Sequence, residues 1–314
     1  MPASTAFGFG ADVAPVRRAP YPWPVKPFDR QHPVRGFLCD PRIADGSRTF
    51  HFGVDVAAPG GTPVYAVAPG KVSFGSPGDV AQNGGIVVVE ADGRNFGYWH
   101  VAPAVQPGVH VPLHGLLGHV ATEPEDWGHV HFAESTHGSN GITYWNPLRP
   151  GALTPFFDYG PPVVDEIVTS LPSQELRGLV DFSVKAHDNT PVEVTQSNPP
   201  GWHGMPVTPA TIRWRLTRGT QTVVPWQVAF DFRTSFHPDV QGDPATDVNF
   251  DAVYAPDTTQ NHPNMPGLFH FWLERGFDTS QYPDGGYMVE VEARDVRGNP
   301  RTGTLAVTFA NADV

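Results

Sequence analysis

Proline and glycine recur along this chain at short intervals and interrupt its apolar segments. The 314 residues include 35 prolines and 33 glycines. Proline ends or kinks a helix and glycine weakens one, whereas both are favoured in the turns between short strands. The apolar runs are short, and no helical period continues beyond a few turns. The sequence therefore predicts a mostly β fold.

The second half of the chain contains several segments in which apolar and polar side chains alternate. The clearest begins at Tyr287, where Val289 and Val291 alternate with Glu290 and Glu292. Successive side chains of a strand point to opposite faces, so such segments suit two packed sheets. We therefore expect a β-sandwich, and residues 287–299 resemble the penultimate strand and turn of bacterial immunoglobulin-like domains. The same alternation occurs at 180–187, 212–216 and 305–309.

Five polar groups in the first half of the chain belong to three short motifs, His-Phe-Gly-Val-Asp, Tyr-Trp-His and His-Val-His. They are His51, Asp55, His100, His129 and His131. On an extended backbone His51 and Asp55 share one face, as do His129 and His131, so each motif can direct both groups inward. A catalytic zinc site needs three protein ligands and an open position for water. The set of histidines and one aspartate meets that requirement.

Asp55 lies inside a largely apolar stretch, residues 52–58. An unpaired carboxylate is costly to bury, so a metal partner explains this residue better than a solvated turn does. Val130 and Phe132 alternate with His129 and His131, which is the pattern of a strand with one apolar and one polar face. The histidine face could be simply solvated, and the complete set of five groups favours a metal site instead.

The residues that join these motifs resemble the M23 peptidases, the lysostaphin-type zinc endopeptidases that cut peptidoglycan peptides. The resemblance extends in family order over about residues 35–152. It implies that His51, Asp55 and His131 bind one Zn²⁺ per chain, and that His100 and His129 are catalytic histidines that do not bind the metal. The matching segments are 51–66, 70–72, 83–85, 98–100, 108–115, 128–132 and 146–148.

Two departures from the family pattern lie beside the expected substrate groove. Gly128 stands where the family usually has proline, and residues 123–127 are acidic where many members are rich in glycine and threonine. Both bear on the identity of the substrate. The chain has neither the His-Glu-x-x-His motif of zincins nor the Gly-x-Ser-x-Gly motif of serine hydrolases.

The remaining histidines and the single cysteine have no place in these motifs. Cys39 is the only cysteine, so an internal disulfide is excluded. We expect Cys39 to be a small buried packing residue, and a role as a zinc ligand is the alternative. Four histidines are expected at the surface or at the rim of the groove. They are His110, His114, His119 and His137.

Charge and hydropathy limit the partners of the chain. The net charge is −12, so the positive surface that binds nucleic acid or an anionic membrane is not expected. No segment is apolar for the length of a membrane-spanning helix, and the amino terminus lacks the pattern of a signal peptide. The family resemblance nevertheless implies an extracellular or cell-envelope location.

The expected organisation has four parts, and the partner of the last is unknown. A proline-rich amino-terminal arm (1–34) precedes the M23-like antiparallel β-sheet domain (35–152). A linker (153–162) then leads to the immunoglobulin-like sandwich (163–314). Within the sandwich, a loop at 238–266 that is rich in aspartate is expected to be solvated surface.

The expected function is hydrolysis of a peptide bond in peptidoglycan stem peptides or cross-bridges by a zinc-activated water, an expectation that rests on the resemblance. Two alternatives remain open. The same groove could bind peptide, or activate another wall hydrolase, without catalysis. The enzyme could also be a zinc peptidase that acts on a peptide from outside the wall.

Overall fold

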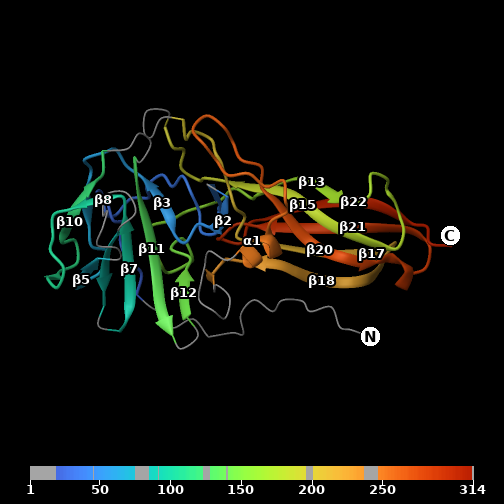
Figure 1. The fold of residues 1–314 in the computed structure, drawn as a ribbon, viewed down its shortest axis with the longest axis horizontal. Helices are drawn as coiled ribbons and strands as arrows, with labels where there is room; N and C mark the ends of the chain where they lie inside the picture. Colours follow the sequence, from blue (N-terminus) through green and yellow to red (C-terminus); the bar gives the residue numbers. More distant parts are fainter. Residues whose placement is uncertain are drawn as a thin grey trace.

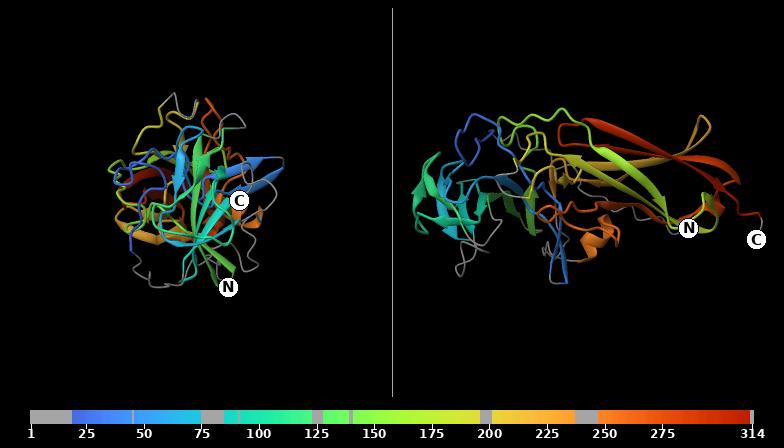
Figure 2. Two further views of the ribbon diagram at one scale, coloured as in Figure 1. Left: turned by 90° about the vertical axis from the view of Figure 1, so that its left-hand side faces the viewer. Right: turned by 90° about the horizontal axis from the view of Figure 1, so that it is seen from above.

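The computed structural model of the chain describes residues 19–44, 46–74, 85–90, 92–122, 128–138, 141–195, 201–236 and 247–312. The molecule is elongated, with the blue and green parts of the chain at one end and the yellow and red parts at the other (Figures 1 and 2). Strands dominate these ranges, so the prediction of a mostly β fold is confirmed. Among the described residues, no helix has the length and apolar character needed to cross a membrane.

The first half of the chain is built around a large sheet whose strands follow one another in the order β19-β12-β11-β7-β6-β5-β9. The central strand β11 pairs with β7 along one edge and with β3 and then β12 along the other. All of these pairings are antiparallel. The strands are β3 (Val54–Ala57), β5 (Gly70–Phe74), β6 (Gly85–Val89), β7 (Arg94–Trp99), β9 (His110–Val111), β11 (His129–Gly138), β12 (Gly141–Trp145) and β19 (Ser235–Phe236).

Two smaller sheets accompany the large one. A hairpin is formed by β1 (Pro41–Ala44) and β2 (Ser47–Phe50), and a three-stranded sheet by β4 (Pro63–Tyr65), β10 (Leu116–Val120) and β8 (Val101–Pro103). Tyr98 and Phe132 project into the core beneath the large sheet. The described part of the amino-terminal arm adds Tyr21 and Trp23 to that core, so it packs on this half of the molecule.

The second half of the chain contains two further sheets with a common apolar core. One comprises β13 (Val163–Thr169), β15 (Leu179–Asn189), β16 (Pro206–Val207) and β20 (His270–Asp278). The other has the order β14 (Glu175–Leu176), β22 (Pro300–Phe309), β21 (Gly285–Arg294), β17 (Thr211–Arg218) and β18 (Gln221–Asp231), and a short helix η1 (Thr279–Gln281) follows β20. Phe182, Trp214, Phe271 and Val289 are buried in their core. The alternating segments of the sequence lie in β15, β17, β21 and β22. The resemblance of this half to immunoglobulin-like domains remains a prediction.

The expectation of a solvated loop at 238–266 is wrong for residues 247–255, whereas most of residues 262–266 are exposed. Residues Asp247–Val253 form the helix α1. Phe250, Val253 and Tyr254 are buried, and their spacing of three and four residues places them on one side of the helical turn. The helix was not predicted because its few apolar residues lie in a segment that is rich in aspartate. The first part of the loop, residues 238–246, which includes Asp243, lies outside the described residues.

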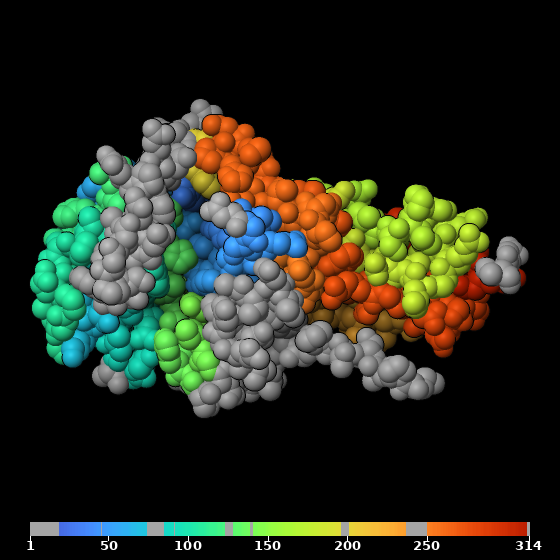
Figure 3. All heavy atoms as spheres, viewed as in Figure 1, coloured from blue at the N-terminus to red at the C-terminus, as the bar shows by residue number. Residues whose placement is uncertain are grey.

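The two halves meet through shared strands and shared cores. Strand β19 belongs to the second half of the sequence but pairs with β12, with Phe236 opposite Tyr144. Conversely, Phe50 of the β1–β2 hairpin packs against Phe232, Phe250 and Tyr254 in the second core. Figure 3 shows blue atoms of the first half directly against orange atoms of the second.

A buried carboxylate adds polar contacts at this junction. Asp40 accepts hydrogen bonds from the backbone N–H of Thr208 at 2.7 Å and of Phe37 at 2.8 Å. Burial raises the pKa of Asp40 to about 6, although the nearby Arg42 and the two N–H donors oppose the rise. Asp40 therefore connects the segment before the β1–β2 hairpin to the second half of the molecule. Cys39, next to it, is fully buried, as predicted.

Candidate metal centre

The candidate metal ligands come together where β3 lies beside β11. In this antiparallel pair Asp55 is directly opposite His131, and both project from the same face of the sheet. His51 precedes β3 in the sequence and lies on the same side, so the three groups converge. Sequence alternation alone predicted the faces, and the strand register supplies the contact.

The ligand atoms of His51, Asp55 and His131 all lie within 4.8 Å of one another. His51 Nε2 is 2.9 Å from Asp55 Oδ1 and 2.7 Å from His131 Nδ1. His131 Nδ1 is 3.2 Å from Asp55 Oδ1. Two ring nitrogens and one carboxylate oxygen at these distances form a candidate zinc site, because nitrogen and oxygen donors of this kind are ordinary zinc ligands.

The surroundings of the cluster orient its lone pairs inward. His51 Nδ1 lies 2.7 Å from the carbonyl oxygen of Phe37 and donates to it, which assigns the neutral ring a lone pair at Nε2. Arg42 Nη2 donates to Asp55 Oδ2 at 2.9 Å, so Oδ1 faces the histidines. Two acceptor atoms, Nε2 of His51 and Oδ1 of Asp55, then face each other inside the protein. A bound cation would interact favourably with both. The residues therefore fit a metal ion.

Close approach of the backbone to this cluster depends on two glycines. A Cβ at Gly36 would lie 2.8 Å from Asp55 Oδ2 and 3.0 Å from the guanidinium of Arg42. A Cβ at Gly53 would lie 2.3 Å from the carbonyl oxygen of Phe132. Any larger residue at either position would displace the groups that form the site.

The two further histidines lie beside the candidate ligands. His129 is buried, and its Nε2 is 3.5 Å from Asp55 Oδ1. The His100 ring is 4.6 Å from the His129 ring and 6.3 Å from the His131 ring, measured between centroids. His100 follows β7 with a φ of +64°, a left-handed conformation that is uncommon for residues other than glycine. The structure thus brings all five groups of the three motifs together.

Burial lowers the pKa of three site histidines, His51, His100 and His129, which are therefore neutral near pH 7. Burial and the nearby Arg42 lower the pKa of His51 to about 4. Burial and the neighbouring His131 lower the pKa of His100 to about 3, while burial and Arg35 hold the pKa of His129 well below its usual value. Neutral imidazoles can bind a metal or accept a proton.

Asp55 differs from the histidines around it. Burial opposes its ionisation, but its contacts with His51, His129 and His131 hold its pKa well below the usual value. The group is therefore a carboxylate near neutral pH. One carboxylate with neutral imidazoles is a suitable ligand set for a divalent cation.

Two further residues shape this site and were not predicted from the sequence. Arg42 belongs to none of the three motifs, and Trp99 is the middle residue of the Tyr-Trp-His motif, to which no role was assigned. The Trp99 ring lies 5.3 Å from the His131 ring, at an angle of 83°. No local pattern in the sequence identifies Arg42, because its contact with Asp55 depends on where the β1–β2 hairpin lies.

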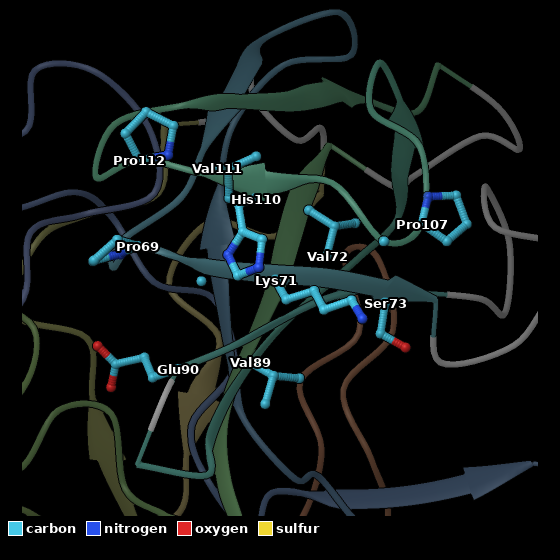
Figure 4. Close-up of a pocket in the computed structure, with 12 residues that line it drawn as sticks. Pro69, Lys71, Val72, Ser73, Val89, Glu90, Pro107, His110, Val111 and Pro112 are labelled. Carbon is cyan, nitrogen blue, oxygen red and sulfur yellow. The ribbon is translucent and has the colours of Figure 1, made fainter.

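The four histidines that were expected at the surface or at the rim of the groove lie away from the metal cluster. Each of the four is exposed to solvent, and none contributes an atom to the cluster. His110 borders a hollow at the β5–β9 end of the large sheet together with Lys71 and Glu90 (Figure 4). None of the five site residues lines this hollow. The exposed residues are His110, His114, His119 and His137.

A second polar cluster in the second half of the molecule has the atom order of a serine-hydrolase triad. His270 Nε2 is 2.8 Å from Ser183 Oγ, and its Nδ1 contacts the carboxylate of Asp257. Ser183 is only 5% exposed and lies on β15, which pairs with β13 on one side and β20 on the other. A buried serine within a sheet leaves little space for a substrate. We interpret the cluster as a structural connection between the segment after α1 and the sheet.

Comparison of the sequence with models of protein families identifies the domain that contains the metal cluster. Residues 49–141 match peptidase family M23. This range contains all five groups of the three motifs, so the predicted family is confirmed for this part of the chain. The match covers less than half of the 314 residues, and it leaves the second half unassigned.

Several solved structures are similar to the M23 domain. A mutant catalytic domain of the prophage-encoded M23 protein EnpA from Enterococcus faecalis is 26% identical; the match covers 43% of this chain and 98% of that chain, with a TM-score of 0.33. A putative M23 peptidase from Pseudomonas aeruginosa is 29% identical over 38% of this chain and 49% of that chain, with a TM-score of 0.25.

The solution structure of lysostaphin matches a longer part of this chain, at 17% identity. The match covers 80% of this chain and 88% of that chain, with a TM-score of 0.29. Because these three TM-scores are all below 0.5, the family assignment rests on the match of residues 49–141. No curated protein matches the chain.

Proposed function

We propose that the chain is a zinc metalloendopeptidase that hydrolyses a peptide bond in the stem peptides or cross-bridges of peptidoglycan. The observation that carries the proposal is the convergence of His51, Asp55 and His131 inside the M23 match, with two further histidines beside them. A cell-envelope or extracellular location follows from that substrate. The second half of the chain is proposed to be an immunoglobulin-like sandwich.

His51, Asp55 and His131 would hold the zinc ion. When bound, zinc polarises the scissile carbonyl group and lowers the pKa of water so that it can attack near neutral pH. The carboxylate of Asp55 offsets part of the charge of the ion, and Arg42 keeps that carboxylate oriented. The protein's contribution is thus a fixed, charge-balanced set of donors.

His129 is proposed as the general base and acid. Its neutral ring can accept the proton of the attacking water and then donate it to the leaving amine. His100 is proposed to donate a hydrogen bond to the carbonyl oxygen of the substrate as negative charge develops on it. The short distance between the two rings, 4.6 Å, allows both to contact one scissile peptide group.

Metal content and peptidoglycan hydrolysis, measured together, test this proposal. The purified chain is expected to contain about one zinc ion and to release soluble fragments from peptidoglycan, and a chelator should abolish the release until zinc is restored. A general protein substrate assayed in parallel distinguishes a wall enzyme from a peptidase with another substrate. A chain that binds zinc and peptide but hydrolyses neither substrate would contradict the proposal and favour a peptide-binding module.

A further inference from the structure

Trp99 occupies the position beside the candidate metal ligands on the large sheet. The strand registers place Gly85 opposite Trp99, Trp99 opposite His131, and His131 opposite Asp55. These four residues therefore form one row across β6, β7, β11 and β3, and the side chains of a row share a face of the sheet. Trp99 is the next side chain along the row from His131.

The indole ring of Trp99 lies flat on a seat made by two glycines. A Cβ at Gly97 would lie 1.9 Å from Cζ3 of the ring, and a Cβ at Gly85 would lie 2.6 Å from Cε2. In both cases the three nearest atoms all belong to Trp99. Contacts below 3.0 Å require a shift, so any other residue at Gly97 or Gly85 would lift the ring off the sheet.

The residues around this seat keep the surface shallow. Val87 and Ala133 lie opposite Gly97 on the two neighbouring strands, so the next row of the sheet carries only short side chains. Trp99 itself remains partly exposed. The edge-on contact with His131, at 5.3 Å between ring centroids, fixes the distance between the indole and the metal cluster.

We infer that Trp99 is the floor of a substrate subsite next to the scissile bond, and that it selects a small side chain such as glycine or alanine there. The inference rests on the proposed function. Neighbouring strands are about 4.8 Å apart and an extended peptide rises about 3.3 Å per residue, so a residue adjoining the scissile bond at His131 lies over Trp99. A flat ring supports a Cα or a methyl group but offers no depth for a branched chain.

The test compares peptides that carry alanine or leucine on either side of the cleaved bond, with binding and hydrolysis measured in parallel. Substrates that differ by one methylene group at such a subsite usually differ by about 10 to 200-fold in kcat/KM. The wild-type chain is expected to prefer alanine by at least about tenfold in kcat/KM at one of the two positions. In Trp99→Ala that preference should disappear through a gain for leucine, whereas Trp99→Phe should retain it.

A double substitution adds an internal control. Gly97→Ala should lift the indole and lower kcat/KM for the alanine peptide by about tenfold or more, mainly by raising KM. The same Gly97→Ala change made in Trp99→Ala should have little effect, because the atoms it collides with are gone. Trp272→Ala, on β20 of the second half, controls for loss of a tryptophan as such.

Zinc content and thermal unfolding of each variant separate changes in the subsite from loss of the fold. Hydrolysis with an unchanged preference in folded, zinc-loaded Trp99→Ala would overturn the inference and leave the proposed function standing. Equal effects of Gly97→Ala with and without Trp99 would also overturn it. Binding that discriminates alanine from leucine through Trp99, without hydrolysis by the zinc-loaded chain, would support the subsite and overturn the proposed function.

Discussion

Arg42 donates a hydrogen bond to Oδ2 of Asp55 at 2.9 Å, while the other oxygen of the same carboxylate faces His51 and His131. One side chain thus orients a candidate ligand from outside the ligand set. Groups that orient metal ligands in this way usually affect metal affinity about 10 to 100-fold. The β1–β2 hairpin carries Arg42, so the position of the hairpin bears on the metal site.

Replacing Arg42 should weaken zinc binding. We expect Arg42→Gln to lower zinc affinity by about 10 to 100-fold, because Asp55 loses the partner that fixes its orientation. Competition with a chromophoric chelator measures the affinity. Arg48→Gln is the matched control, since Arg48 lies on the same hairpin but pairs with Asp251. Equal affinities of Arg42→Gln and the wild-type chain would contradict the role of Arg42.

The two histidines of the His-Val-His motif should separate metal binding from proton transfer. His131→Ala is expected to lose zinc and hydrolysis together, whereas His129→Ala should keep most of the zinc and lose hydrolysis by about 100-fold or more. Metal analysis after gel filtration and a peptide assay measure the two effects. The exposed His137, on the same strand, supplies the control His137→Ala. Equal zinc loss in His129→Ala and His131→Ala would refute the assignment of roles.

The Ser183 cluster should contribute to stability and not to hydrolysis. Ser183→Ala removes the hydrogen bond to His270 and is expected to cost about 1 kcal/mol of unfolding free energy. Urea unfolding measures the loss, and the peptide assay should be unaffected. If Ser183→Ala abolished a hydrolytic activity while stability stayed the same, the cluster would be a second active site instead of a structural connection.

Asp188 should make stability depend on pH. Burial, with the neighbouring charge of Asp158, raises the pKa of Asp188 to about 8 from an ordinary value near 3.8. The folded chain therefore binds this proton more tightly than the unfolded chain does, so the group costs stability progressively as the pH rises from about 4 to about 8. Below about pH 4 the carboxyl is protonated in both states and the cost vanishes.

Asp188→Asn tests this pH dependence. The variant should be more stable than the wild-type chain at pH 8, by at least about 1 kcal/mol, and the difference should disappear toward pH 4. Chemical unfolding across this range measures it. Asp29→Asn, at an exposed position, is the control. A stability difference that did not change with pH would show that Asp188 titrates normally.

The parts of the fold that follow from local patterns were predictable from the sequence. Alternation placed Tyr287, Val289 and Val291 on one face, and all three are buried on β21. The three short motifs likewise predicted five groups that lie close together in the structure. The helix α1 was missed because Phe250 and Tyr254 form only one helical turn within a polar segment. A pattern that short does not stand out from its surroundings.

Features that depend on distant contacts were not predictable. The role of Arg42 depends on how the hairpin folds back over β3, and the seat of Trp99 depends on which glycines the register places beneath it. Phe50, next to a candidate zinc ligand, packs with residues about two hundred positions later, such as Phe250. Local periodicity contains no information about such pairings.

The pairing of β19 with β12 joins the half that contains the M23 match to the second half, so we expect the two halves to depend on each other in folding. A chain cut after the first half would expose the β12 edge, a template for aggregation, and would leave Phe50 without its neighbours. Heating should therefore melt the molecule in one cooperative transition. In that case the M23 domain could not be replaced by another M23 domain of different specificity unless the second half of the chain were replaced with it.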